Sequence, residues 1–387
     1  NIMRIGIDAS SIVDGGGFTH LNQFLINYLV LNETSVERLN IYASENILKS
    51  LPNSSKFSKR NFRLLNRSRF CRIFFQMFLF DSILKKECDI LLSITGDYTG
   101  NFKPYVGMSQ NMMLYEREFW GEIKSIKERG KFYFNFKRQQ KCFNNAEGII
   151  FLSNYAKKYI TKVLDLKNKT STIIHHGISN KFISNKSVIK NLKSYSEKAP
   201  FRFLYISTVH VYKNQWNVVK AVSKLRIKGY PVQLTLIGDI IYKPSGNLLN
   251  KTIKNVDPNH KFIDHILSVP HNKISEFYRN HDGIIFASSC ENMPNILLES
   301  MGAGKPIACS DKSPMDEFLK DGGIYFNARS VNSISNSLEK MLKSLKSFEA
   351  LNHQNKEELK KYTWDYTSKE TINFIKSTLK KYNDVQR

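Results

Sequence analysis

The chain has 387 residues with 41% hydrophobic and 12% aromatic side chains, which excludes an intrinsically disordered protein and predicts two domains. Its 58 lysines and arginines stand against 34 acidic residues, and the net charge of +24 indicates an anionic partner: nucleic acid, an anionic membrane surface or a phosphorylated small molecule. A solvated basic surface with no such partner is the alternative.

The cysteines and the apolar runs favour a reducing cytoplasm. The five cysteines are odd in number and show no CxxC spacing, so neither a disulfide framework nor a zinc site is indicated. The opening, NIMRIGIDAS, is typical of a strand rather than a signal peptide. The longest apolar run, at 73–80, is too short to span a bilayer. We therefore expect a cytoplasmic protein that is peripheral on the inner face of a membrane if it binds one.

Residues 3–9 form the first expected strand, and three glycines at 15–17 lead from it into a helical pattern with one apolar face. Four further apolar segments, separated by helical ones, are expected strands: 89–94, 105–109, 147–153 and 170–177. Strands that alternate with helices predict a parallel sheet, which binds ligands at the carboxyl ends of its strands.

A polar stretch separates this series from a second one and predicts a linker at 186–200. Strands of the second series are expected at 201–207, 231–239, the end of 273–288, 306–311 and 322–327. The tail is one amphipathic helix from about residue 364. The chain therefore divides into a domain at 1–185, the linker, a second domain at 201–365 and a terminal helix at 366–387.

Two loops of this plan follow strands and precede helices. The Gly15–Gly17 turn frees backbone N–H groups to approach an anion, although it lacks the GxGxxG and P-loop spacings and a plain tight turn explains it equally well. Lys213 lies in the loop after the strand that ends at Ser207, where a lysine can neutralise a diphosphate. A solvated surface lysine is the competing interpretation.

Two acids, Glu291 and Glu299, stand eight residues apart in SSCENMPNILLESMGAGKP. Glu291 follows the strand GIIFASS, and Glu299 lies within the helix that begins near Pro294. Because a carboxylate accepts two hydroxyl hydrogen bonds, either residue can bind a vicinal diol such as a ribose. An acid at the position of Glu299 is also commonly a solvated or capping residue.

Together these segments resemble the retaining GT-B glycosyltransferases, in particular glycosyltransferase family 4, over nearly the whole chain. CENMPNILLESMGAGKPI (290–307) resembles the E-x7-E signature of that family, and YISTVHVYKNQWNVVKA (205–221) resembles the opening of its second domain. DGGGFTHL (14–21) is similar to the glycine loop of its first domain, and IIHHGIS (173–179) to the segment before its linker. The resemblance implies two Rossmann-like domains facing across a cleft, with the C-terminal helix crossing back to the first domain.

The resemblance further implies a hexosyltransferase that uses a nucleotide-diphosphate sugar and needs no metal or other cofactor. Glu291 and Lys213 are the implied catalytic residues, with Glu299 on the ribose. Further implied donor-binding residues are Ser207, Asn292, Met293, Pro294, Asn295, Gly16 and Gly17. The arginine that the family places near the lysine is missing, since Val209–Tyr212 fill that region.

The acceptor side departs from the family pattern. Gln110 and Asn111 stand where many members carry a His-Asp pair, and together with His20 they are the implied acceptor- or sugar-binding residues. The first domain also contains two basic, aromatic segments, 56–72 and 126–141, which suit a glycan or lipid-linked glycan acceptor on an anionic leaflet. The apolar pattern after Arg69 fits a helix in the membrane interface or, equally, a buried helix.

We therefore expect an enzyme of bacterial surface polysaccharide synthesis, such as lipopolysaccharide assembly. A nucleic-acid-binding protein that uses the basic segments is one alternative, although no recognised nucleic-acid module is present. A catalytically inert protein with the GT-B fold is another, because the expected arginine and histidine are missing.

Overall fold

The computed structural model describes residues 2–13, 15–184 and 189–386, and it divides the chain into two compact units. Unit 1 comprises Asn1–Trp120, Lys124–Gly177 and Tyr362–Arg387, and unit 2 comprises Gly121–Ile123 and Ile178–Lys361. Each unit is built on one parallel sheet with helices, so the predicted Rossmann-like α/β architecture is confirmed. Residues 186–188 of the predicted linker lie outside the described residues.

The sheet of unit 1 has the order β3-β2-β1-β4-β5-β6-β7, and every neighbouring pair is parallel. Its strands are β1 Met3–Asp8, β2 Val36–Tyr42, β3 Phe57–Arg60, β4 Ile90–Ser93, β5 Tyr105–Met108, β6 Gly148–Phe151 and β7 Ser171–Ile173. All residues of β4, β5 and β6 are buried, which is why these strands are continuous apolar runs in the sequence.

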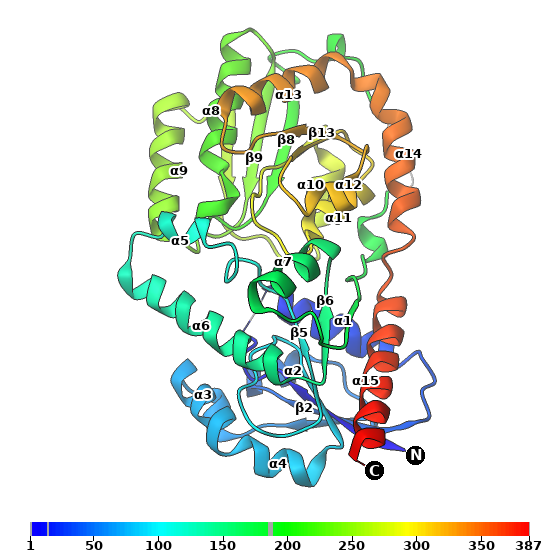
Figure 1. Ribbon diagram of the computed structural model, residues 1–387. Coiled ribbons are helices and arrows are strands. Elements are labelled where there is room, and N and C mark those ends of the chain that lie inside the picture. The colour runs from blue at the N-terminus through cyan, green and yellow to red at the C-terminus, as the bar shows by residue number, and fades with distance from the viewer. Residues whose placement is uncertain (1, 14, 185–188, 387) are drawn as a thin grey trace. The chain divides into compact units, whose positions relative to one another are not determined.

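Helices cover this sheet, and the C-terminal helix belongs to the same unit. They are α1 Gly15–Tyr28, α2 Glu45–Ser50, α3 Arg69–Phe78, α4 Phe80–Glu87, α6 Ile126–Asn145, α7 Asn154–Leu164 and α15 Trp364–Gln386. The short helix α5, Glu118–Glu122, begins in unit 1 and ends with residues of unit 2. The predicted apolar face of α1 is buried, and α15 lies beside it (Figure 1). The Ser368 hydroxyl of α15 donates to the Phe24 carbonyl of α1, which ties the C-terminal helix to the N-terminal one.

Unit 2 repeats the plan with six parallel strands in the order β10-β9-β8-β11-β12-β13. Its strands are β8 Phe201–Ile206, β9 Val232–Ile237, β10 Ile263–Ile266, β11 Gly283–Phe286, β12 Ile307–Ser310 and β13 Ile324–Phe326. Its helices are α8 Gln215–Ile227, α9 Lys243–Val256, α10 Ile274–Asn280, α11 Asn295–Gly302, α12 Met315–Leu319, α13 Val331–Lys343 and α14 Phe348–Leu359.

Three strands are missed by the sequence pattern: β2, β3 and β10. The two outermost, β3 and β10, have a neighbour on one side only and keep partly exposed polar side chains. β3 lies inside the basic segment 56–72, so the charges of Lys59 and Arg60 obscure a strand whose only buried residue is Phe57. Edge strands of this kind lack the continuous apolar run that marks a central parallel strand.

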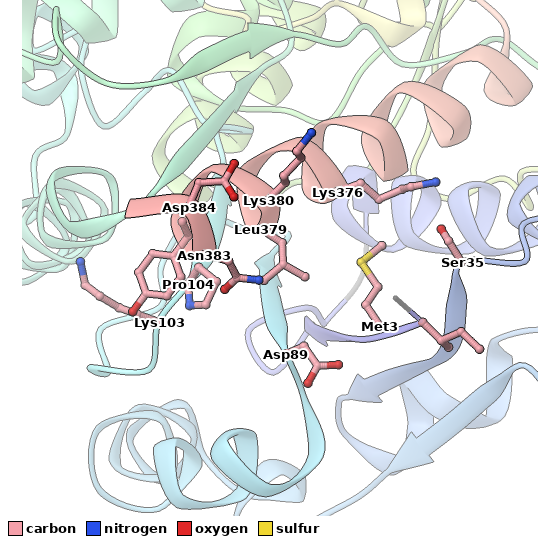
Figure 2. Close-up of a pocket in the computed structure, with 12 residues that line it drawn as sticks. Met3, Ser35, Asp89, Lys103, Pro104, Lys376, Leu379, Lys380, Asn383 and Asp384 are labelled. Carbon is pink, nitrogen blue, oxygen red and sulfur yellow. The ribbon is translucent and has the colours of Figure 1, made fainter. Parts of the chain in front are cut away.

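In both sheets the strand order reverses once, between β1 and β4 in unit 1 and between β8 and β11 in unit 2. Ligands of open parallel sheets bind outside the carboxyl ends of the strands at such a reversal. A cavity of about 760 Å³ lies at the opposite, amino edge of the unit 1 sheet, where Met3, Asp89 and Pro104 face α15 (Figure 2). None of the described residues that line it is a predicted site residue.

Candidate active site

Lys213 and Glu291 meet at the strand reversal of unit 2. Lys213 ends a short helical turn in the loop after β8, and Glu291 lies in the loop between β11 and α11. Lys213 Nζ donates to Glu291 Oε1 at 2.5 Å, and the two side chains are only 7% and 17% exposed. The pairing follows from topology, because β8 and β11 are neighbours in the sheet although their loops are far apart in sequence.

Backbone and side-chain hydrogen bonds hold the two loops together. Asn214, which adopts the left-handed conformation with φ of 53°, donates from Nδ2 to the Ala287 carbonyl at 2.9 Å. Ser289 N donates to the Tyr212 carbonyl at 2.9 Å, and the Tyr205 hydroxyl donates to the Lys213 carbonyl at 2.6 Å. Lys213 is therefore fixed at both its backbone and its ammonium group before any ligand binds.

A buried ion pair of this kind adds little net stability to the fold. Removing two charges from water costs several kcal/mol, and the attraction between them recovers this only in part. Lys213 Nζ also makes a cation–π contact, 4.8 Å from the centroid of the Tyr212 ring. Since a carboxylate has about four lone-pair positions, Glu291 retains capacity for hydroxyl donors beyond its bond to Lys213.

Glu299 lies on α11 in a different environment. Its Oε1 is 3.7 Å from Nε2 of His271, and its side chain is 16% exposed. Lys181 Nζ lies 2.9 Å from Nδ1 of the same histidine. Burial lowers the pKa of Lys181, and the Glu299 carboxylate opposes this shift. Burial, followed by the negative charge of Glu299, raises the pKa of Tyr278 well above its usual value.

The other predicted donor-binding residues of unit 2 lie along the same two loops. Ser207 is buried just after β8, and Asn292 and Met293 are buried after Glu291. Pro294 precedes the first residue of α11, Asn295, whose N–H donates to the Met293 carbonyl at 3.0 Å. Because proline has no N–H, it supplies no backbone donor to a diphosphate.

His210 occupies the loop region in which the family resemblance places an arginine. Its Nδ1 accepts from Val211 N at 2.9 Å. Burial, and secondly the positive charge of Lys213, lower the pKa of His210 to about 4. The imidazole is therefore neutral at pH 7, and Lys213 is the only cation of the loop 207–214 at that pH.

This neutral histidine predicts an acid-dependent loss of stability. The unfolded chain protonates His210 near its ordinary pKa of about 6.5, whereas the folded chain does so only near 4. Protonation therefore favours unfolding as the pH falls from 6.5 to 4, and a shift of this size corresponds to about 2 kcal/mol after allowance for partial exposure of the ring. Urea unfolding of wild type and His210→Gln at pH 7 and pH 4 should show the wild type losing that much more free energy of unfolding. An equal loss in both would contradict the assignment.

In unit 1, three of the predicted residues gather at the carboxyl edge of the sheet, Gly17 after β1 and Gln110 and Asn111 after β5. Gly17, Gln110 and Asn111 line one cavity of about 450 Å³. Gln110 Nε2 donates to the Ile94 carbonyl at 2.6 Å, and a Cβ added to Gly17 would lie 3.7 Å from Gln110 Oε1. Gly16 lies beside Gly17 in the first turn of α1, and nothing within 4 Å would meet a Cβ there.

Four further residues line the same cavity: Arg69, Arg72 and Arg138, which belong to the basic segments 56–72 and 126–141 assigned above to the acceptor side, and Asp97. The two α3 arginines belong to the basic segment 56–72, where their sequence neighbours hide them among surface charges. Arg138 is likewise one of several basic residues in its segment. Asp97 belongs to no motif, and its only sequence signal is its position after β4 at the strand reversal.

His20 is placed in the interior of unit 1, away from this cavity. It is 1% exposed, and its ring centroid lies 4.5 Å from that of His176 and 5.6 Å from that of Trp364. Neither ring nitrogen has a hydrogen-bond partner among the described residues, and burial lowers the pKa of His20 well below its usual value. The ring is thus a neutral member of the aromatic core between α1 and α15.

The part of the chain that the structure describes contains no candidate metal-binding cluster and no candidate membrane-spanning helix. No group of three or more His, Cys, Asp or Glu side chains is arranged there to hold a metal ion. Within the same residues, no helix has the length and apolar character needed to cross a bilayer.

One protein family matches part of the chain, and the matched residues lie almost entirely in unit 2. Residues 189–362 match the model described as glycosyl transferases group 1. This match supports a group 1 glycosyltransferase domain in unit 2. It includes the loop of Lys213 and both acids of the E-x7-E segment.

Two curated relatives are glycosyltransferases. The chain is 24% identical over 210 residues to the amylovoran biosynthesis glycosyltransferase AmsD of Erwinia amylovora. The aligned residues cover 52% of this chain and 54% of that protein. The chain is 28% identical over 106 residues to an uncharacterised glycosyltransferase of Methanocaldococcus jannaschii, 27% of each chain. The matched part thus spans about half the length of the first relative and about a quarter of the second.

Solved structures match over nearly the entire chain. A sucrose-phosphate synthase from Thermosynechococcus elongatus has a TM-score of 0.76 at 13% identity, with 97% of this chain and 98% of that one covered. HepE of Anabaena, solved with UDP and glucose, has a TM-score of 0.69 at 13% identity, with 96% and 98% covered. At these identities the similarity establishes the fold, and the predicted GT-B fold class is confirmed.

Proposed function

We propose that this chain is a glycosyltransferase that moves a sugar from a nucleotide-diphosphate sugar to a glycan or lipid-linked glycan, with retention of the anomeric configuration, as in glycosyltransferase family 4. The observation that carries the proposal is the buried Lys213–Glu291 pair at the strand reversal of a unit that matches glycosyl transferases group 1. The AmsD relative supports a role in polysaccharide synthesis, and the UDP-bound HepE supports a nucleotide-sugar donor.

In this proposal unit 2 binds the donor. Lys213 and the backbone donors after Glu291 stabilise the negative charge that develops on the leaving diphosphate, and Glu291 binds the hydroxyls of the transferred hexose. Glycosidases need a second carboxylic acid to protonate the leaving group, but a diphosphate leaves without a proton. One carboxylate is therefore free for binding, and Glu299 would accept the ribose hydroxyls. With Lys213 supplying the cation, no metal is required.

Contact with an anionic membrane surface is a finer part of the proposal. Only Phe75 and Gln76 of α3 are buried, so the helix is not the fully buried one that the sequence also allowed. Phe70 and Phe78 are 78% and 63% exposed. Exposed aromatic side chains beside basic ones are typical of segments that lie in the membrane interface. Vesicle co-sedimentation with and without anionic lipid tests this contact.

The donor proposal is tested by titrating the full chain with UDP-, GDP- and dTDP-hexoses. One nucleotide should bind in preference to the others, and Glu299→Ala should weaken its binding by about tenfold or more, the effect of losing one or two hydrogen bonds to a charged group. Glu276→Gln, an exposed acid on α10, is the control and should bind normally. Equal nucleotide affinity in wild type and Glu299→Ala would remove Glu299 from the ribose.

Retention is tested separately on the reaction product. The anomeric configuration of the new glycosidic bond, measured by proton NMR, should equal that of the donor sugar. An inverted product would exclude the family 4 mechanism while leaving donor binding intact.

A further inference from the structure

We propose that the cavity at the carboxyl ends of β1 and β4 binds an oxyanion of the acceptor, a phosphoryl or carboxyl group, through Arg69 and Arg72. That the bound molecule is the acceptor rests on the proposed function, whereas the binding of an oxyanion at this place in unit 1 does not. The cavity of about 450 Å³ is within the size range of small-ligand sites and lies at the strand reversal, where open parallel sheets bind their ligands.

The charges around this cavity do not balance. Arg138 Nη2 lies 3.2 Å from Asp97 Oδ2, so these two side chains neutralise each other. The remaining lone pairs of Asp97 accept hydrogen bonds from the Ser11 and Thr95 hydroxyls, each at 2.6 Å. Within the described ranges, neither Arg69 nor Arg72 forms an ion pair with a carboxylate. Two positive charges therefore face the cavity without a counter-charge from those residues.

Hydrogen-bond donors at the cavity are also unused. The Nε atoms of Arg72 and Arg138 are shielded from solvent and have no partner among the described residues. A shielded donor that forms no hydrogen bond costs free energy, and the cost is larger when the donor is charged. An oxyanion is the complementary acceptor, because its oxygens match the planar fork of a guanidinium.

The two arginines share one side of α3, and Arg69 has a hydrogen-bond partner on α6. Arg69 and Arg72 are three residues apart on α3 and therefore lie on the same side of that helix. Arg69 also donates to Asn135 Oδ1 of α6. Burial, and secondly the positive charge of Arg138, lower the pKa of Arg69. A bound anion would relieve this repulsion between like charges.

A second layer of contacts orients Arg138. Its Nη2 donates to Gln76 Oε1 at 2.6 Å, and Gln76 Nε2 donates to Asp8 Oδ2 at 2.8 Å. Asp8 is buried at the end of β1, and burial, followed by the charge of Asp97, raises its pKa to about 6. The network leaves Gln110 and Asn111 on the cavity wall for the neutral part of the ligand. The expected ligand is thus a sugar or other polyol that carries one oxyanion.

The test is isothermal titration of the full chain with three probes: methyl phosphate, glucuronate and neutral methyl glucoside. One of the two anions should bind, and which one binds identifies the group, whereas the glucoside should not bind at the same concentration. Arg72→Gln should weaken the binding of that anion by about tenfold, and Arg69→Gln/Arg72→Gln by about a hundredfold. Arg67→Gln removes the same charge from an exposed position next to α3 and should change affinity by less than about twofold.

Two results would overturn the inference. The first is equal anion affinity in wild type and Arg72→Gln. The second is a loss of binding in Lys213→Gln but not in Arg72→Gln, which would place the anion in unit 2. If Arg72→Gln does not fold, Arg72→Lys keeps the charge without the planar fork and should still weaken binding several-fold. None of these measurements uses a nucleotide sugar. If nucleotide-sugar binding fails, the anion titration still tests this inference, so the two proposals can be contradicted independently.

Discussion

Glu291→Gln should lower the rate of sugar transfer by about 10² to 10³-fold while leaving nucleotide affinity within a few-fold of wild type. The reason is that a preorganised electrostatic contact acts mainly in the transition state, and removal of one such contact typically costs this much in turnover. Glutamine keeps the shape of the side chain and can still accept from Lys213, so the change removes charge rather than volume. Transfer rate and nucleotide binding should be measured on the same preparations.

The control for this prediction is a second Glu→Gln change in unit 2, at the exposed Glu276 of α10, which should leave the rate unchanged. Because Lys213 loses its buried counter-charge, Glu291→Gln should also reduce stability, and assays belong well below its unfolding temperature. A variant that stays folded and transfers sugar at the wild-type rate would remove Glu291 from the catalytic role.

Gly177→Ala should destabilise unit 1 by about 3 kcal/mol or more, the range of severe steric overpacking. A Cβ at this position would lie 2.1 Å from Trp364 N and 2.5 Å from the carbonyl carbon of Thr363. Both are backbone atoms at the start of α15, so no side-chain rotation relieves the clash. The Thr367 hydroxyl, which donates to the His175 carbonyl at 2.6 Å, holds the two segments together at the same place.

Gly130→Ala is the matched control for Gly177→Ala. Gly130 lies inside α6 with nothing within 4 Å of an added Cβ, so alanine should raise helix stability by about 0.5–1 kcal/mol. Calorimetric unfolding of both variants measures the difference. A stable Gly177→Ala protein would show that the segment after β7 and the start of α15 are not packed as closely as the structure has them.

The loops of unit 2 show which features the local sequence predicts and which it does not. The apolar run of β11 and the helical pattern after Pro294 predict a strand, a loop and a helix, and the structure has them at those places. The contact between Glu291 and Lys213 has no local signal, because it depends on β8 and β11 being neighbours in the sheet. The neutrality of His210 has no local signal for the same reason, because it follows from burial by residues that are distant in the sequence.

The sequence by itself determined the alternation of buried strands and amphipathic helices, and with it two parallel-sheet units and the C-terminal helix. Those features depend on periodicity and on continuous apolar runs, which are local properties of the chain. Only the tertiary structure decided that His20 belongs to the core and that Arg69 and Arg72 of a basic segment line a cavity with Asp97 and Arg138. Burial and charge pairing are sums over neighbours that lie far apart in sequence, so they exist only once the sheets have formed.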